Sequence, residues 1–104
     1  MALINLDKNN FKQEVYQEKT PILIWFYQLG SDYCQMMRPL LDQLANDYEG
    51  KLNIGRVDMD REKALVYLFN IEASPSYILF KNCEIARTGI GELSIESLIE
   101  LIES

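Results

Sequence analysis

The sequence contains no histidine and only two cysteines, Cys34 and Cys83. Histidine is the most frequent general base and the usual partner of a nucleophilic serine or cysteine, so its absence excludes the hydrolase pairs built on it. A zinc site with nitrogen and sulfur ligands also needs more such residues than one copy of this chain supplies. We therefore expect no metal and no other cofactor.

Long apolar runs and an excess of positive charge are missing as well. The longest apolar stretch, residues 21–27, is far shorter than the ~20 residues of a membrane-spanning helix. No signal peptide is visible at the N-terminus, and two cysteines do not make a secreted disulfide framework, so we expect a cytoplasmic protein. With 10 basic and 16 acidic residues and a net charge of -6, the chain should repel phosphate backbones and anionic lipids. We expect no nucleic-acid partner and no membrane partner.

What the sequence does contain is an alternation of strand and helix patterns. Its 104 residues suffice for one domain, which we place at 1–104, and are too few for two. Alternating strands and helices indicate parallel crossover units, and the final hairpin indicates an antiparallel edge. The sequence thus predicts an α/β fold of order β-α-β-α-β-α-β-β-α, a mixed sheet with helices on both faces. The strands are expected at 3–6, 21–27, 52–59, 76–81 and 84–90, and the helices at 11–18, 33–48, 61–69 and from 95 onward.

Polar residues that cap helix N-termini mark where several of these helices begin. Ser31 and Ser94 precede apolar residues with helical spacing, as N-cap residues do. Asn10 and Gln13 resemble a capping pair for the first helix, and Asp60 is predicted to cap the third.

Three segments in register resemble the thioredoxin family. Residues 25–39 include Ser31-Asp32-Tyr33-Cys34 and match the family's aromatic strand end, its Cys-x-x-Cys motif and the helix proline. Ser74-Pro75-Ser76 and the strand after it match the family's cis-proline segment, and residues 88–91 match its late glycine segment. The resemblance extends from about Leu6 to Ile102. It implies a thioredoxin fold, thiol–disulfide exchange on protein or peptide substrates, and a reductase among the partners; we expect a monomer.

The sequence departs from the family pattern where the chemistry takes place. Ser31 stands where the resemblance puts the first, nucleophilic cysteine, and Gly30 replaces the aromatic residue before it. Trp25 occupies the position of a buried acid that assists proton transfer in many relatives. A cysteine at position 31 in the source gene would make a working dithiol motif. With serine, enzyme activity of the protein-disulfide oxidoreductase type is expected to be weak or absent.

The candidate site follows from this comparison. We assign Cys34, the retained thiol, and Ser31, the position of the missing nucleophile, as the catalytic positions. A serine hydroxyl is not ionised at neutral pH and no histidine is available to activate it, so Ser31 is interpreted as a helix cap. Cys34 is expected to be the more buried of the two positions and only weakly reactive. We assign as substrate-binding residues Asp32 and Tyr33, which lie within the motif, and Ser74, Pro75 and Gly91, which belong to the later segments of the resemblance.

Three hypotheses about the function remain open from the sequence. The chain is an impaired dithiol oxidoreductase, a redox-inactive module that binds peptides in a groove at Pro75, or a monothiol exchanger acting through Cys34. Cys83 is predicted in a hairpin turn about 25 Å from the motif along an extended strand, too far for a disulfide with Cys34. Arg38 and Arg56 are interpreted as solvated charges. At least one of the adjacent methionines of the second helix is expected in the core.

Overall fold

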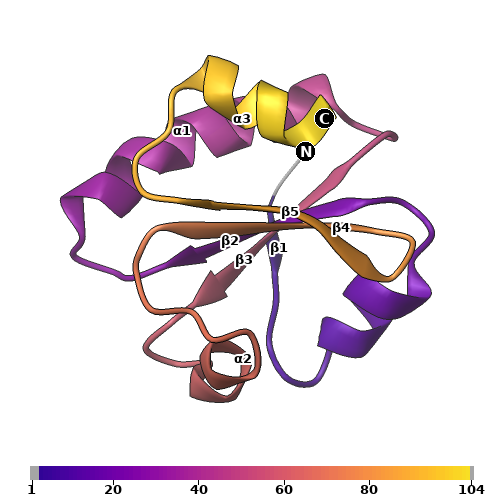
Figure 1. Ribbon diagram of the computed structural model, residues 1–104, viewed down its shortest axis with the longest axis horizontal. Coiled ribbons are helices and arrows are strands. Elements are labelled where there is room, and N and C mark those ends of the chain that lie inside the picture. The colour runs from indigo at the N-terminus through magenta and orange to yellow at the C-terminus, as the bar shows by residue number, and fades with distance from the viewer. Residues whose placement is uncertain (1–2, 104) are drawn as a thin grey trace.

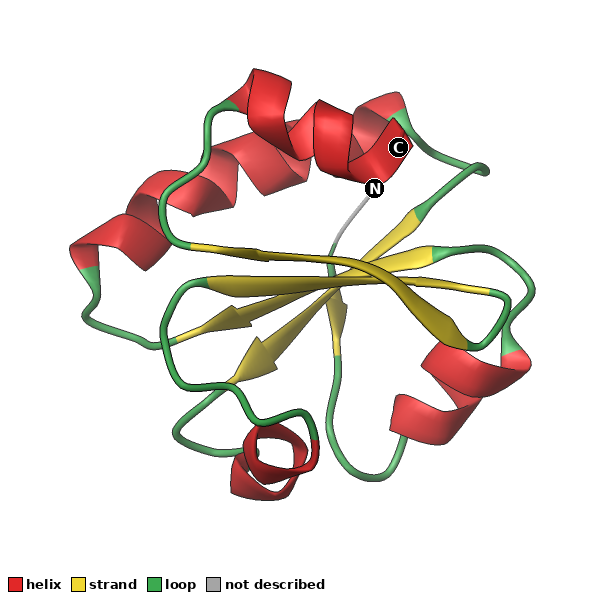
Figure 2. Ribbon diagram, in the orientation of Figure 1, coloured by secondary structure: helices red, strands yellow, loops and turns green. Residues whose placement is uncertain are grey.

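The computed structural model describes residues 3–103, which form a five-stranded mixed sheet with helices on both faces (Figure 1 and Figure 2). The strand order is β1-β3-β2-β4-β5. The predicted fold class and element order are confirmed, and most helices and strands begin and end within a residue or two of the expected positions. The elements are β1 (Ile4–Asn5), a short π-type helix η1 (Lys12–Gln17), β2 (Ile22–Tyr27), α1 (Asp32–Asp47), β3 (Asn53–Asp58), α2 (Lys63–Leu68), β4 (Ser76–Lys81), β5 (Glu84–Ile90) and α3 (Ile95–Glu103).

The strand β2 lies at the centre of the sheet because its residues are apolar on both faces. It pairs in parallel with β3 and antiparallel with β4. Its first five residues are all buried, with exposures between 0% and 2%. Such a strand has no solvent-facing side, which explains why its sequence is a continuous apolar run rather than an alternating one. The buried strand therefore fixes the position of its last residue, Tyr27, and of the loop that follows at the carboxyl end of β2.

The sheet separates two apolar cores. α1 and α3 cover one face, and η1 and α2 cover the other (Figure 1). Alternate residues of β2 point to the two sides: Leu23 and Trp25 pack with the α1 and α3 side, and Ile24 and Phe26 with the other. The helix after β2 and the helix after β3 thus lie on opposite faces of the sheet. No helix in the described range is both long and apolar enough to cross a membrane.

A glycine in β3 allows β1 to pack closely. A Cβ atom at Gly55 would lie 2.6 Å from Leu6 Cδ1 and 3.2 Å from Ile22 Cδ1. Because overpacking a core forces side chains out of their rotamers, we expect Gly55→Val to lower the free energy of unfolding by about 1–3 kcal/mol. Urea denaturation measures this change. Gly50→Ala is the comparison variant. Gly50 has a φ of +84° and open space around it, so this substitution measures the effect of backbone strain without overpacking.

Two of the predicted helix caps are wrong. The Asn10 side chain does not cap η1; its Oδ1 accepts the Asp7 N–H at 2.9 Å, and the Asp7 carboxylate in turn accepts the Asn10 N–H. Asp60 does not cap α2, because Asp58 Oδ1 accepts the N–H groups of Asp60 and Arg61 and orders the turn before the helix. In both cases an aspartate two or three residues earlier forms the turn, so the helix begins later than its polar signal suggests.

Candidate functional site

Ser31 begins α1 as its N-cap, as predicted. Its backbone is extended, with φ -83° and ψ 124°, and its Oγ accepts the Cys34 N–H at 3.4 Å. Asp32 follows as the first helical residue, where a negative charge is stabilised by the helix dipole. The serine hydroxyl thus takes part in a structural hydrogen bond at the position where the family has its nucleophile.

The Cys34 thiol lies beneath this helix start. Its side chain is 2% exposed and packs in the same core as Met37. Its Sγ accepts the Gln28 N–H at 3.4 Å. Met37 is fully buried whereas Met36 is 54% exposed, which confirms that one of the two methionines packs in the core. Cys34 is therefore held in place by packing and by one hydrogen bond to the β2–α1 loop.

Gln28 connects the motif to the segment before β4, and the sequence did not single it out. Its carbonyl accepts the Ser31 N–H at 3.3 Å, and its side-chain Oε1 accepts the Ser74 hydroxyl at 2.8 Å. Its Nε2 lies 3.5 Å from Asp60 Oδ1. The only signal was that Gln28 is the first polar residue after the buried strand. We assign it as a positioning residue of the site.

Ser74, Pro75 and Gly91 form the second side of the site. The Ser74–Pro75 peptide bond is cis. The Gly91 N–H donates to the Pro75 carbonyl at 2.8 Å, so the segment after β5 is fixed against the segment before β4. Gly91 has a φ of +88°, a left-handed conformation that favours glycine. The hydrogen bonds therefore bring Ser74, Pro75 and Gly91 into one connected arrangement with Gln28.

Asp32 and Tyr33, the other two substrate-binding candidates, are exposed to solvent. Tyr33 is 59% exposed. Within the described residues, no hydrogen bond joins either side chain to Ser74 or Pro75. They border the site at the surface of α1, and their contact with a substrate remains a prediction.

Tyr77 is a second residue beside the candidate site that the sequence analysis did not single out. It is fully buried, and its hydroxyl donates to the Gly91 carbonyl at 3.0 Å. Burial, followed by the nearby charges of Cys34 and Glu92, raises the pKa of Tyr77 above its ordinary value of 10.0. The signal available in the sequence was a tyrosine inside a largely apolar strand, because a buried tyrosine needs a partner for its hydroxyl.

The raised pKa of Tyr77 predicts weaker stability in alkali. The unfolded chain releases the phenol proton first, so the stabilisation is complete below about pH 10 and is lost as the pH rises toward the higher pKa of the folded state. We expect the free energy of unfolding to fall by up to about 1.4 kcal/mol per pH unit above about pH 10. Urea denaturation across this range should show a weaker decline for Tyr77→Phe. An equal decline in both proteins would contradict the assignment.

Trp25 fills the position where the resemblance places a buried acid. It is 2% exposed, and its Nε1–H has no hydrogen-bond partner among the described residues. Its ring stacks on Tyr27 with centroids 4.8 Å apart, and the Arg56 guanidinium lies 5.7 Å from the Tyr27 centroid. The site therefore has an apolar ring and an unpaired donor beside Cys34, and no carboxylate at this position to take up a proton.

Cys83 lies far from this arrangement. It occupies the β4–β5 turn, which is at the end of the sheet opposite the start of α1 (Figure 1). The residue is exposed, its φ is +65°, and its thiol hydrogen-bonds the Tyr16 carbonyl at 3.1 Å. Both cysteines are free thiols. Cys83 therefore cannot supply the sulfur that position 31 lacks.

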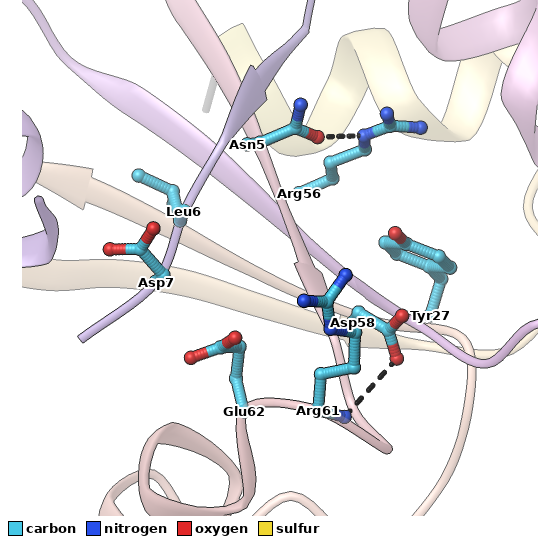
Figure 3. A pocket seen from close by; sticks show the side chains of 8 residues that line it. All are labelled: Asn5, Leu6, Asp7, Tyr27, Arg56, Asp58, Arg61 and Glu62. Carbon is cyan, nitrogen blue, oxygen red and sulfur yellow. Dashed lines mark hydrogen bonds between the residues drawn. The ribbon is translucent and has the colours of Figure 1, made fainter. Parts of the chain in front are cut away.

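A polar pocket of about 290 Å³ lies at the ends of β1 and β3, next to the motif (Figure 3). Both signs of charge line it: Arg61 lies among the carboxylates of Asp7, Asp58 and Glu62, and Arg56 lies beside Asn5. Arg56 also donates to the Asn5 side chain. Within residues 3–103, no cluster of three or more histidine, cysteine or acidic side chains is placed to hold a metal ion. Because both signs of charge line this pocket, it does not favour a ligand of either charge.

The fold and the site define a small α/β protein with a thiol in the first turn of the helix that follows its central strand. The model of the thioredoxin family matches residues 2–104 of the sequence, and the chain belongs to that family. It is 30% identical to a thioredoxin-like protein of Synechocystis over 103 residues, 99% of this chain and 94% of that protein. It is 31% identical to the thioredoxin of Staphylococcus saprophyticus (99% and 97% covered) and 26% identical to that of Pseudomonas aeruginosa (98% and 94% covered). Membership supports a thiol–disulfide redox function in general, on protein thiol or disulfide substrates.

Proposed function

We propose that this chain carries out thiol–disulfide exchange through Cys34 alone and has lost the dithiol reduction of its family. The observation that carries this proposal is the start of α1, where Ser31 Oγ caps the helix and Cys34 is the only sulfur of the motif. Dithiol reduction needs a second thiolate close enough to attack the mixed disulfide. Ser31 has no sulfur, and Cys83 lies at the other end of the sheet.

The expected step is a single exchange. The Cys34 thiolate attacks a substrate disulfide, a bond forms between Cys34 Sγ and one substrate sulfur, and the other sulfur leaves as a thiol after taking up a proton. Because no neighbouring thiol resolves this mixed disulfide, an external thiol must release the product. Burial of Cys34 makes the attack slow. We place this exchange in the cytoplasm, where a reducing environment keeps free thiols reduced.

Turnover of a small disulfide substrate with an external thiol as reductant tests the proposal. The wild-type chain should show weak catalysis above the uncatalysed exchange, and Cys34→Ala should remove it. Cys83→Ser is the matched control, because it removes the other thiol at the far end of the sheet. Equal rates for wild type and Cys34→Ala would contradict the proposal.

A second candidate function is redox-inactive peptide binding at the same surface. It is favoured by three exposed apolar side chains around the start of α1: Leu29 is 74% exposed, Tyr33 59% and Met36 54%. Solitary exposed apolar residues are common, but a group of them indicates a contact surface. Calorimetric binding of an extended peptide to Cys34→Ala separates the candidates. Binding there, together with no exchange by the wild type, would favour this second function.

A further inference from the structure

A second pocket, on the Cys34 side of Tyr27, has a lining that differs in charge from the pocket in Figure 3. Its volume is about 270 Å³. Arg38 and Arg56 line it, and no acidic residue does, in a chain whose net charge is -6. Its other lining residues are Trp25, Tyr27, Gln28, Leu29, Gly30, Cys34 and Gln35. The lining thus combines two guanidinium groups, two aromatic rings and the retained thiol.

The topology of the sheet explains why a pocket occurs here. Ligands of open α/β sheets bind at the carboxyl ends of strands whose following helices lie on opposite faces. β2 and β3 are such a pair, because α1 follows β2 on one face and α2 follows β3 on the other (Figure 1). Tyr27 ends β2 beside Asp58, its partner in β3. The pocket therefore lies at the carboxyl end of β2, where the loops after β2 and β3 lead to opposite faces of the sheet.

The two guanidinium groups of this pocket differ in their partners. Arg56 makes no ion pair within residues 3–103. It donates a hydrogen bond to the Asn5 side-chain oxygen, and its guanidinium lies over the Tyr27 ring. Tyr27 and Arg56 line both this pocket and the one in Figure 3. Arg38, by contrast, pairs with Asp42 at 3.1 Å. A ligand with an anionic oxygen and a flat apolar part complements the Arg56 guanidinium and the two aromatic rings.

We propose that this pocket binds small disulfides that carry a carboxylate and presents them to Cys34. The inference rests on the proposed exchange function and names its substrate class. In the step, Cys34–SH and R–S–S–R give Cys34–S–S–R and R–SH: one S–S bond breaks, another forms, and the thiol proton passes to the leaving sulfur. A different thiol, R′–SH, then attacks the R sulfur of this mixed disulfide, which forms R–S–S–R′ and restores Cys34–SH. A small thiol from solution thus supplies the sulfur that position 31 lacks.

Two aromatic disulfides of different charge test this assignment. Dithiobis(nitrobenzoate) carries a carboxylate on each ring, and dithiodipyridine is neutral. Their rates with Cys34 are measured in Cys83→Ser, and their rates with Cys83 in Cys34→Ser, by the absorbance of the released thiol. The ratio of the anionic to the neutral rate should be about tenfold higher for Cys34 than for exposed Cys83, because two guanidinium groups line only the first site.

Charge variants then locate the effect. Arg56→Gln should lower the anionic-to-neutral ratio at Cys34 by about three- to tenfold, and Arg38→Gln should act in the same direction. Arg87→Gln is the matched control, since Arg87 is exposed on β5 and does not line the pocket. An equal ratio at both cysteines, or a ratio unchanged by Arg56→Gln, would overturn the pocket assignment while leaving exchange at Cys34 intact. No reaction of Cys34 with either reagent in the folded protein would overturn both proposals.

Discussion

The Ser31→Cys variant is expected to reduce insulin disulfides about a hundredfold faster than the wild-type chain. A thiol at the N-cap of α1 would lie next to free helix N–H groups, which stabilise a thiolate. Cys34, three residues on, would then resolve the mixed disulfide. The backbone needs no change, because the extended conformation of Ser31 accepts either side chain. Turbidity of the reduced insulin chains measures the rate.

A second helix of the same chain offers a matched control. Ser94 caps α3, where its Oγ accepts the Ser97 N–H at 3.1 Å, as Ser31 Oγ accepts the Cys34 N–H in α1. Ser94→Cys places a thiol at a helix N-cap with no cysteine three residues on, so it should give no gain. A Ser31→Cys variant as slow as the wild type would show that the site has lost more than one sulfur.

Truncation of Trp25 is expected to produce the largest loss of stability. Trp25→Ala removes a buried ring from the core beside Cys34, and the cavity that remains should lower the free energy of unfolding by about 3–5 kcal/mol. Trp25→Phe also loses volume, but it removes the N–H that has no partner in the described chain. Its loss should therefore be under about 1.5 kcal/mol.

Urea denaturation of both variants distinguishes packing from hydrogen bonding at this position. If the Nε1–H were satisfied in the folded protein, Trp25→Phe would lose that bond as well as volume, and its stability would approach that of Trp25→Ala. A wide gap between the two variants supports an unpaired donor.

Much of the fold was predictable because the signals are local and strong. The apolar run of β2 indicated a strand buried on both faces, and its first five residues are buried. Asn82 and Cys83 indicated the hairpin, and both have a positive φ, as a tight turn requires. The caps at Asn10 and Asp60 failed because an aspartate two or three residues earlier accepts the N–H groups of the preceding turn, and the helix begins later. Sequence shows which residues are able to cap, whereas geometry decides which one does.

The site was less predictable than the fold because its contacts join distant segments. Ser31 and Cys34 are three residues apart, so their hydrogen bond followed from the capping pattern. Gln28 and Ser74 are 46 positions apart, and no periodicity pairs them. Arg38 and Arg56 looked like solvated charges, and the fold brings both to the pocket that contains Cys34. Charged residues that are distant in the sequence can contribute to one pocket only where the fold brings them together.

The family resemblance located the site, whereas the residues of this chain set its chemistry. The same hydrogen bond that makes Ser31 a good helix cap also shows how the fold tolerates loss of the sulfur. Serine satisfies the Cys34 N–H, so α1 begins with a capped N-terminus although no nucleophile is present there. Structure and redox activity are therefore separable at this position, and a single atom decides between one-thiol and two-thiol chemistry.

The lifetime of the mixed disulfide tests this account most directly. Cys83→Ser, with and without Ser31→Cys, is incubated with a disulfide-bonded peptide, quenched with acid at intervals and read by intact mass and peptide mapping. With Ser31, a covalent adduct at Cys34 should accumulate and persist until an external thiol is added. In the protein that also carries Ser31→Cys, the adduct should be transient and the peptide should leave reduced. A folded Ser31 chain that forms no adduct at Cys34, or that releases reduced peptide unaided, would contradict the account.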